Sequence, residues 1–343
     1  MRRSALFIIG CALSLYVIGA APAWADNGPH VKGAGLTPDS CAGCHRAHTA
    51  KAPYLLKESE EQLCFTCHGS SGAGSNEDVL DGVGYSGPAR ETVAGALRGG
   101  GFKYALINTA EPKVERNAET GKLIDATISP LETGEASTSS HSYSQTEQTA
   151  WGNGTVSETV NYGKGIKLGC TSCHDQHGNG NYRILRPIPN ESGAASEVAI
   201  PDVQTKDTEG KPTGNEYKYT TTNYWHSWDT NDKNFKYKIS EWCTQCHSRY
   251  LAGSGSYKTN SGDAVFTYRH RSSYTQEQYE NYEKESPVKA RPNCIQCHVS
   301  HGSNASMGTF SQSVTWPDGS AAGSDSRLLR LNNRGVCQTC HNK

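Results

Sequence analysis

One pentapeptide recurs along this chain and accounts for almost all of its cysteines. Twelve of the 13 Cys residues form six Cys-x-x-Cys pairs, and a histidine directly follows each pair. Cys-x-x-Cys-His is the attachment signal for c-type haem, in which two thiols bond to the porphyrin and the adjacent histidine ligates iron. The pairs are Cys41 and Cys44, Cys64 and Cys67, Cys170 and Cys173, Cys243 and Cys246, Cys294 and Cys297, and Cys337 and Cys340, with His45, His68, His174, His247, His298 and His341 as proximal ligands.

Two other uses of cysteine pairs explain this pattern less well. A disulfide scaffold needs an even number of cysteines in a secreted chain but no histidine after each pair. A zinc site needs paired half-sites rather than one repeated pentapeptide. Six copies of one signal therefore predict six covalently attached haem c groups.

The composition suits a chain that folds around haem. Hydrophobic residues make up only 35% of the sequence, and the 36 glycines bury little surface. The 33 basic and 34 acidic residues nearly balance, which excludes a nucleic-acid binder driven by phosphate neutralisation. A mean hydropathy of −0.66 excludes a polytopic membrane protein. We expect a multihaem cytochrome c fold of mostly irregular coil, with short α-helical turns at each motif, few short strands, and the chain of haems as the core.

The N-terminus has the pattern of an export signal. Arg2 and Arg3 precede an apolar run over residues 5–21, and Ala23-Trp24-Ala25 forms a small-x-small cleavage site. We expect residues 1–25 to be a cleaved signal peptide and residues 26–343 to be one exported domain without a membrane span. The apolar run is short for a spanning helix, although an uncleaved anchor is the alternative. The expected location is extracellular or at the cell surface, with the periplasm as the alternative.

The remaining histidines are numerous enough to fill the second axial position of all six irons, which predicts bis-histidine ligation at all or nearly all of them. Seven histidines lie outside the motifs, and Met307 is the only methionine after the expected cleavage site. Bis-histidine haem lacks the thioether that raises the potential of His/Met haem and has no open coordination position, which favours electron transfer at low potential over catalysis. The predicted distal ligands are His30, His48, His141, His177, His270 and His301, with His226 as the spare.

Three of these histidines have a fixed spacing to a motif. His48, His177 and His301 each follow a proximal histidine by three residues, in the first, third and fifth motifs. Residues three apart share one face of a helical turn, so the second histidine cannot reach the opposite side of its own haem. We therefore expect each to ligate a neighbouring haem, so that one short turn ties two haems together.

The motif spacing predicts close haem pairs and two insertions. Leu55-Leu56 and Leu328-Leu329 occupy similar places between paired motifs, which indicates a doubled haem unit at both ends of the chain. The haem-free insertions cover about 69–169, with strands expected around 155–162, and about 190–240.

In its order of motifs the chain resembles the OmcS-like family of hexahaem outer-surface c-type cytochromes, whose subunits polymerise into electron-conducting extracellular filaments. The resemblance covers nearly all of residues 26–343. It rests on the histidine before the first motif, the added histidines of the odd motifs, the stretch from Cys170 to Gly178, Ser240-Glu241-Trp242-Cys243, Arg269-His270, and a final motif followed only by Asn342 and Lys343.

This resemblance implies haems stacked in one continuous chain within a mostly irregular fold. It also implies that His48 ligates a haem in the adjacent subunit, that of the fifth motif, which would lock a polymer of identical copies. Other redox proteins or extracellular electron acceptors would be the further partners. A monomeric periplasmic or surface electron shuttle is the alternative function. A multihaem oxyanion reductase is less favoured, because it needs an iron with an open position.

Overall fold

The computed structural model describes residue 30 and residues 38–72, 75–86, 90, 92–107, 113–116, 118–119, 123–127, 133–151, 163–200, 204–206, 212–215, 233–248, 294–313, 326–333 and 335–338. The expected signal peptide, the strands expected at 155–162, and His226, His270, Cys340 and His341 lie outside these residues. None of the described helices is both long enough and apolar enough to cross a membrane.

The first cysteine of each of the six motifs lies on a helix. The helices are α2 (Pro38–Cys44), α3 (Glu60–His68), α4 (Cys170–Cys173), α5 (Lys233–Cys243), α8 (Cys294–Cys297) and α9 (Gly335–Gln338). One helical turn brings two cysteines three residues apart onto the same face. The spacing of the motif itself therefore accounts for the shortest of these helices, whereas α3 and α5 extend further toward the N-terminus.

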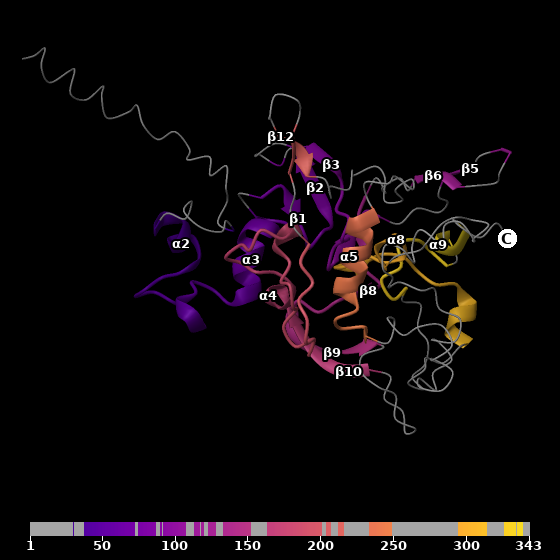
Figure 1. Cartoon of the computed structure of the whole chain (residues 1–343). Helices are drawn as coiled ribbons and strands as arrows, with labels where there is room; N and C mark the ends of the chain where they lie inside the picture. Colours follow the sequence, from indigo (N-terminus) through magenta and orange to yellow (C-terminus); the bar gives the residue numbers. More distant parts are fainter. Residues whose placement is uncertain are drawn as a thin grey trace, which may run out of the picture.

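These helices lie along the molecule in sequence order, from α2 at one end to α9 at the other (Figure 1). α3 contacts α4, and α5 contacts α8. The first and second motifs are close as well, since the Cys44 thiol interacts electrostatically with that of Cys67, and so are the third and fourth, since Cys173 interacts with Cys246. The motifs therefore form a row rather than a compact cluster.

The segments between motifs form small antiparallel sheets. β1 (Glu77–Asp78), β2 (Val83–Ser86) and β3 (Thr92–Ala96) make a three-stranded sheet in that order. The two-stranded sheets pair β4 (Tyr104–Ala105) with β7 (Glu135–Ala136), β5 (Lys113–Arg116) with β6 (Leu123–Thr127), β8 (Ser139–Ser140) with β13 (Gly302–Ser303), β9 (Ser144–Trp151) with β10 (Gly163–Gly169), and β11 (Gln204–Lys206) with β12 (Pro212–Asn215).

The strands are short, as the sequence predicted, but they are more numerous than the few expected. Most of those in the described part of the chain fall within the first insertion, residues 69–169. Buried backbone N–H and C=O groups must find hydrogen-bond partners, and hairpins supply these partners within the insertion itself. This local pairing turns a stretch that looked irregular into a series of small sheets.

A repeated turn follows the first, third and fifth motifs, partly within the short 3₁₀ helices η1 (Pro53–Leu55) and η2 (Tyr182–Ile184). Isolated bridges join each turn to its own motif, at His45 and Leu56, His174 and Leu185, and His298 and Leu329. In each turn two successive residues that are not glycine have positive φ: Tyr54 and Leu55 (60° and 59°), Arg183 and Ile184 (48° and 52°), and Arg327 and Leu328 (48° and 65°). The unit that the sequence indicated at both ends of the chain therefore occurs a third time in the middle.

Two small apolar clusters hold the described part together. The first joins Ala105–Ile107 of the insertion to Val299, which follows the fifth motif, and to Val336 of α9. The second contains Leu185, Val198, Ile200 and Ile239. Leu328 and Leu329 pack against the first cluster, and Leu185 belongs to the second. These leucines lie in the repeated turns, so the apolar contacts hold the turns that follow the third and fifth motifs.

We expect Ile200→Ala to lower the free energy of unfolding by about 2–4 kcal/mol, because this side chain is only 1% exposed and its loss leaves a cavity in the second cluster. Val93→Ala on β3 is the control, since Val93 is 56% exposed and should change the free energy by less than about 0.5 kcal/mol. Denaturant unfolding of the haem-loaded protein, followed by circular dichroism, measures both. Equal effects of the two variants would contradict a stabilising role for the second cluster.

Candidate functional site

Histidines of the described chain face one another in pairs. Each pair combines the proximal histidine of one motif with a histidine that the sequence predicted as a distal ligand. The ring centroids are 6.3 Å apart for His68 and His30, 6.3 Å for His45 and His177, 6.4 Å for His174 and His301, and 6.5 Å for His247 and His141. The structure thus provides the partners that the sequence left open.

These separations fit one iron between the two rings. A metal–imidazole bond is about 2 Å long and the ring centre lies about 1 Å behind the nitrogen, so two imidazoles on opposite sides of one iron have centroids about 6 Å apart. The rings are 24° and 21° from parallel in the pairs of His68 and His45, and 59° and 48° in those of His174 and His247. Both arrangements suit axial ligands, because an imidazole can rotate about its bond to iron.

Backbone carbonyls hold the outer ring nitrogen of the odd-motif histidines. Nδ1 of His45 lies 2.9 Å from the carbonyl oxygen of Tyr54, Nδ1 of His174 lies 2.9 Å from that of Arg183, and Nδ1 of His298 lies 3.0 Å from that of Arg327. A carbonyl only accepts, so Nδ1 carries the proton and Nε2 keeps its lone pair for iron. The carbonyl residue is in each case the first residue with positive φ in the repeated turn. That unusual backbone conformation therefore aims an acceptor at the proximal histidine.

Two predicted distal ligands, His30 and His141, are held in the same way. The carbonyls come from the residues directly before His177 and His301. Nδ1 of His30 lies 2.7 Å from the carbonyl oxygen of Gln176, and Nδ1 of His141 lies 2.7 Å from that of Ser300. Gln176 and Ser300 directly precede His177 and His301. Each such segment therefore contacts the ligands of two motifs at once: it offers an imidazole to one and a carbonyl to the other.

Burial keeps several of these imidazoles neutral. It lowers the pKa of His141 and His174, and it lowers the pKa of His301 to about 3, with a smaller contribution from nearby His174. Neutral imidazole is the form that binds a metal, so these rings need to release no proton when they do so. Phe102 stacks on the His301 ring at a centroid distance of 4.8 Å, which fixes its orientation.

Cysteines of successive motifs lie beside each other. The described motif cysteines are thiols rather than disulfides. The thiols of Cys64 and Cys170 form a hydrogen bond, as do those of Cys243 and Cys294. Burial raises the pKa of the Cys173 thiol to about 12. Groups attached at successive motifs would therefore be close neighbours.

The donor set fits haem iron better than a metal ion bound only by side chains. Within the described ranges there is no cluster of three or more His, Cys, Asp or Glu residues that could hold a metal. A structural zinc site needs four protein ligands. A porphyrin supplies the equatorial ligands of its iron, so the protein adds only two, which is what each facing pair offers.

Two predicted ligands have no facing histidine within the described residues. His298 of the fifth motif has its Nδ1 held by Arg327 but no imidazole opposite it. His48 is exposed and lies just after α2, at one end of the row. Cys337 of the sixth motif is also exposed. The predicted ligands His270 and His341 lie outside the described residues.

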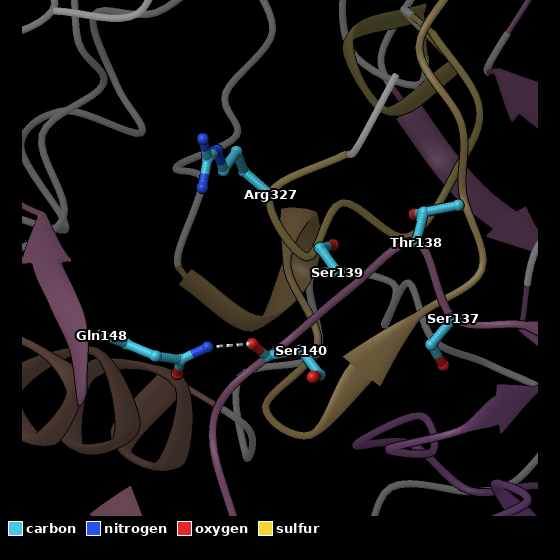
Figure 2. Close-up of a pocket in the computed structure, with 6 residues that line it drawn as sticks. All are labelled: Ser137, Thr138, Ser139, Ser140, Gln148 and Arg327. Carbon is cyan, nitrogen blue, oxygen red and sulfur yellow. Dashed lines mark hydrogen bonds between the residues drawn. The ribbon is translucent and has the colours of Figure 1, made fainter. Parts of the chain in front are cut away.

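A polar cavity of about 300 Å³ reveals a side chain that sequence reasoning missed. Its lining residues are Ser137, Thr138, Ser139, Ser140, Gln148 and Arg327 (Figure 2). Gln148 Nε2 donates to the Ser140 carbonyl at 3.0 Å, and Gln148 Oε1 accepts from the Ser142 backbone N–H at 2.5 Å. One amide on β9 therefore clamps the backbone on both sides of His141.

Residues 34–73 match the family described as the doubled CXXCH motif. No curated protein and no solved structure matches the chain. The CXXCH motifs indicate covalently bound c-type haem, and the doubled motif supports a multihaem c-type cytochrome involved in electron transfer. Multihaem cytochromes of this kind are typically electron carriers.

We expect Gln148→Ala to loosen His141 and to produce a high-spin haem band in the absorption spectrum, because one axial imidazole loses its backbone clamp. Glu147→Ala is the matched control, since Glu147 is the preceding residue on β9 and its side chain is exposed. A spectrum of Gln148→Ala that stays as low-spin as that of the control would contradict this role.

Proposed function

We propose that this protein is an exported electron carrier that binds six c-type haems, each between two histidines, and passes electrons along the row they form. The four facing histidine pairs are the observation that carries the proposal, since each has a motif histidine on one side and a separation that fits one iron. The expected cleavage site after Ala25 supports export.

The order of the described pairs supports an assignment of the ligands that lie elsewhere. His30 precedes the first motif and faces the histidine of the second, and His141 precedes the third motif and faces that of the fourth. His270 has the same place before the fifth motif, so we assign it to His341 of the sixth. His226 then remains the spare histidine.

The arrangement suits electron transfer rather than catalysis on a substrate. Bound haem supplies one-electron chemistry at its iron. The chain would contribute two imidazoles per iron, and the hydrogen bonds to Nδ1 would leave each Nε2 free to bind it. With both axial positions filled, no site is left at which an oxyanion could bind iron. This supports an electron carrier over a reductase.

We infer that the row continues from one copy of the chain to the next in a filament. His177 of the third motif faces the histidine of the first, and His301 of the fifth faces that of the third. Each added histidine thus serves the motif two places earlier. By the same rule His48 of the first motif would serve His298 in the fifth motif of a neighbouring copy.

The ends of the row support this inference. α2 lies at one end and α8 and α9 lie toward the other (Figure 1). Near His48 the repeated turn exposes Tyr54 and Leu55, by 87% and 53%. In the fifth motif's turn, by contrast, Leu328 packs against the first apolar cluster. The exposed apolar pair would be covered by the neighbouring copy.

Electron microscopy of the secreted, haem-loaded protein tests the filament. We expect filaments with a continuous row of haems, and we expect His48→Ala to abolish them because it removes the ligand that joins two copies. Thr49→Ala, the next exposed residue, should polymerise normally. Filaments of unchanged length from His48→Ala would contradict the linkage. Isolated particles of the wild-type protein with six haems, seen by mass spectrometry, would favour the monomeric shuttle.

A further inference from the structure

The proximal histidine of the second motif is held differently from those of the odd motifs. Nδ1 of His68 lies 3.1 Å from the hydroxyl oxygen of Ser75, and the imidazole also interacts with the Glu77 backbone. The Ser75 hydroxyl donates to Oε2 of Glu77 at 2.9 Å and accepts from the Glu77 backbone N–H at 3.1 Å. Ser75 and Glu77 are both partly buried. A carboxylate is therefore connected to an iron ligand through one hydroxyl.

The directions of these hydrogen bonds follow from the available protons. A serine hydroxyl has one proton, and an ionised carboxylate can only accept. The Ser75 proton therefore goes to Glu77, and His68 Nδ1–H donates to Ser75. This leaves Nε2 of His68 with its lone pair, as an iron ligand requires. Consecutive hydrogen bonds polarise one another, so the carboxylate makes the His68 imidazole more electron-rich.

We propose that Glu77, acting through Ser75, is a positioning residue that lowers the reduction potential of the haem iron ligated by His68. The proposal rests on the proposed function, in that the second motif must carry a haem. Reduction of that iron takes one electron from a neighbouring haem or a chemical reductant, cancels one positive charge, and forms or breaks no bond. A more basic imidazole and a nearby negative charge both favour the oxidised state.

The other charged groups near His68 do not remove this effect. The guanidinium of Arg90 donates from one nitrogen to the carbonyls of Gly69 and Gly72, both at 2.8 Å, and lies 4.0 Å from the carboxylate of Asp78, which is fully buried. The charge of Arg90 is therefore opposed by Asp78. Burial lowers the pKa of His68, and His30 and, more weakly, Arg90 lower it further, whereas the hydrogen bond to the Glu77 backbone and the Glu77 charge act in the opposite direction.

The test is a redox titration of the full haem-loaded protein followed by electron paramagnetic resonance, which distinguishes individual low-spin haems. Glu77→Gln and Ser75→Ala should both raise the midpoint potential of the same single haem and leave the others unchanged. Glu77→Asp keeps the charge and should raise it less. Glu61→Gln, which removes an acid on α3 that lies near Cys64 but outside the relay, is the control for charge acting through space and should shift that haem's potential less than Glu77→Gln does.

Three results would overturn the proposal. These are an unchanged potential in both Glu77→Gln and Ser75→Ala, a shift in Glu77→Gln without one in Ser75→Ala, and an equal shift in Glu61→Gln. The last two would show that charge alone acts through space. Failure of the proposed function is distinguishable, because mass spectrometry of the wild-type protein would then show no haem on Cys64 and Cys67.

Discussion

The pairing of histidines between different motifs is the interaction on which the rest of the structure depends. A Cys-x-x-Cys-His segment would supply one axial imidazole to its haem, so the second must come from outside that segment. His45 faces His177, and His174 faces His301, across more than a hundred residues in each case. Each pair therefore closes a long loop. A few such closures can order a chain whose apolar clusters are small.

The hydrogen bonds behind the rings turn this pairing into a repeating design. The turn after each odd motif aims a carbonyl at the histidine of that motif. The residues before His177 and His301 aim carbonyls at His30 and His141, which face the histidines of the preceding motifs. One segment thus positions ligands of several irons. His68 of the second motif is held differently from the histidines of the odd motifs, since its Nδ1 lies against the Ser75 hydroxyl, which donates to Glu77.

Much of the site could be predicted from the spacing of His177 and His301 and from the small number of histidines left to bind iron, and much of the fold could not. His30, His141, His177 and His301 were predicted as distal ligands, and the structure places each opposite a motif histidine. The many strands of residues 69–169 were not expected, because glycine- and serine-rich sequence has weak strand signals and its pairing is non-local. Gln148 was also missed, since nothing in its sequence context relates it to His141.

The sequence by itself determined the chemistry that the chain can perform. Covalent attachment needs two cysteines and a histidine at one short spacing, and this spacing is visible in the sequence wherever the chain later folds. Only the tertiary structure decided which histidine faces which, because a distal ligand is selected by distance in space rather than along the chain. It also decided that Ser75 and Glu77 lie behind His68, which depends on how the segment after α3 packs back against that helix.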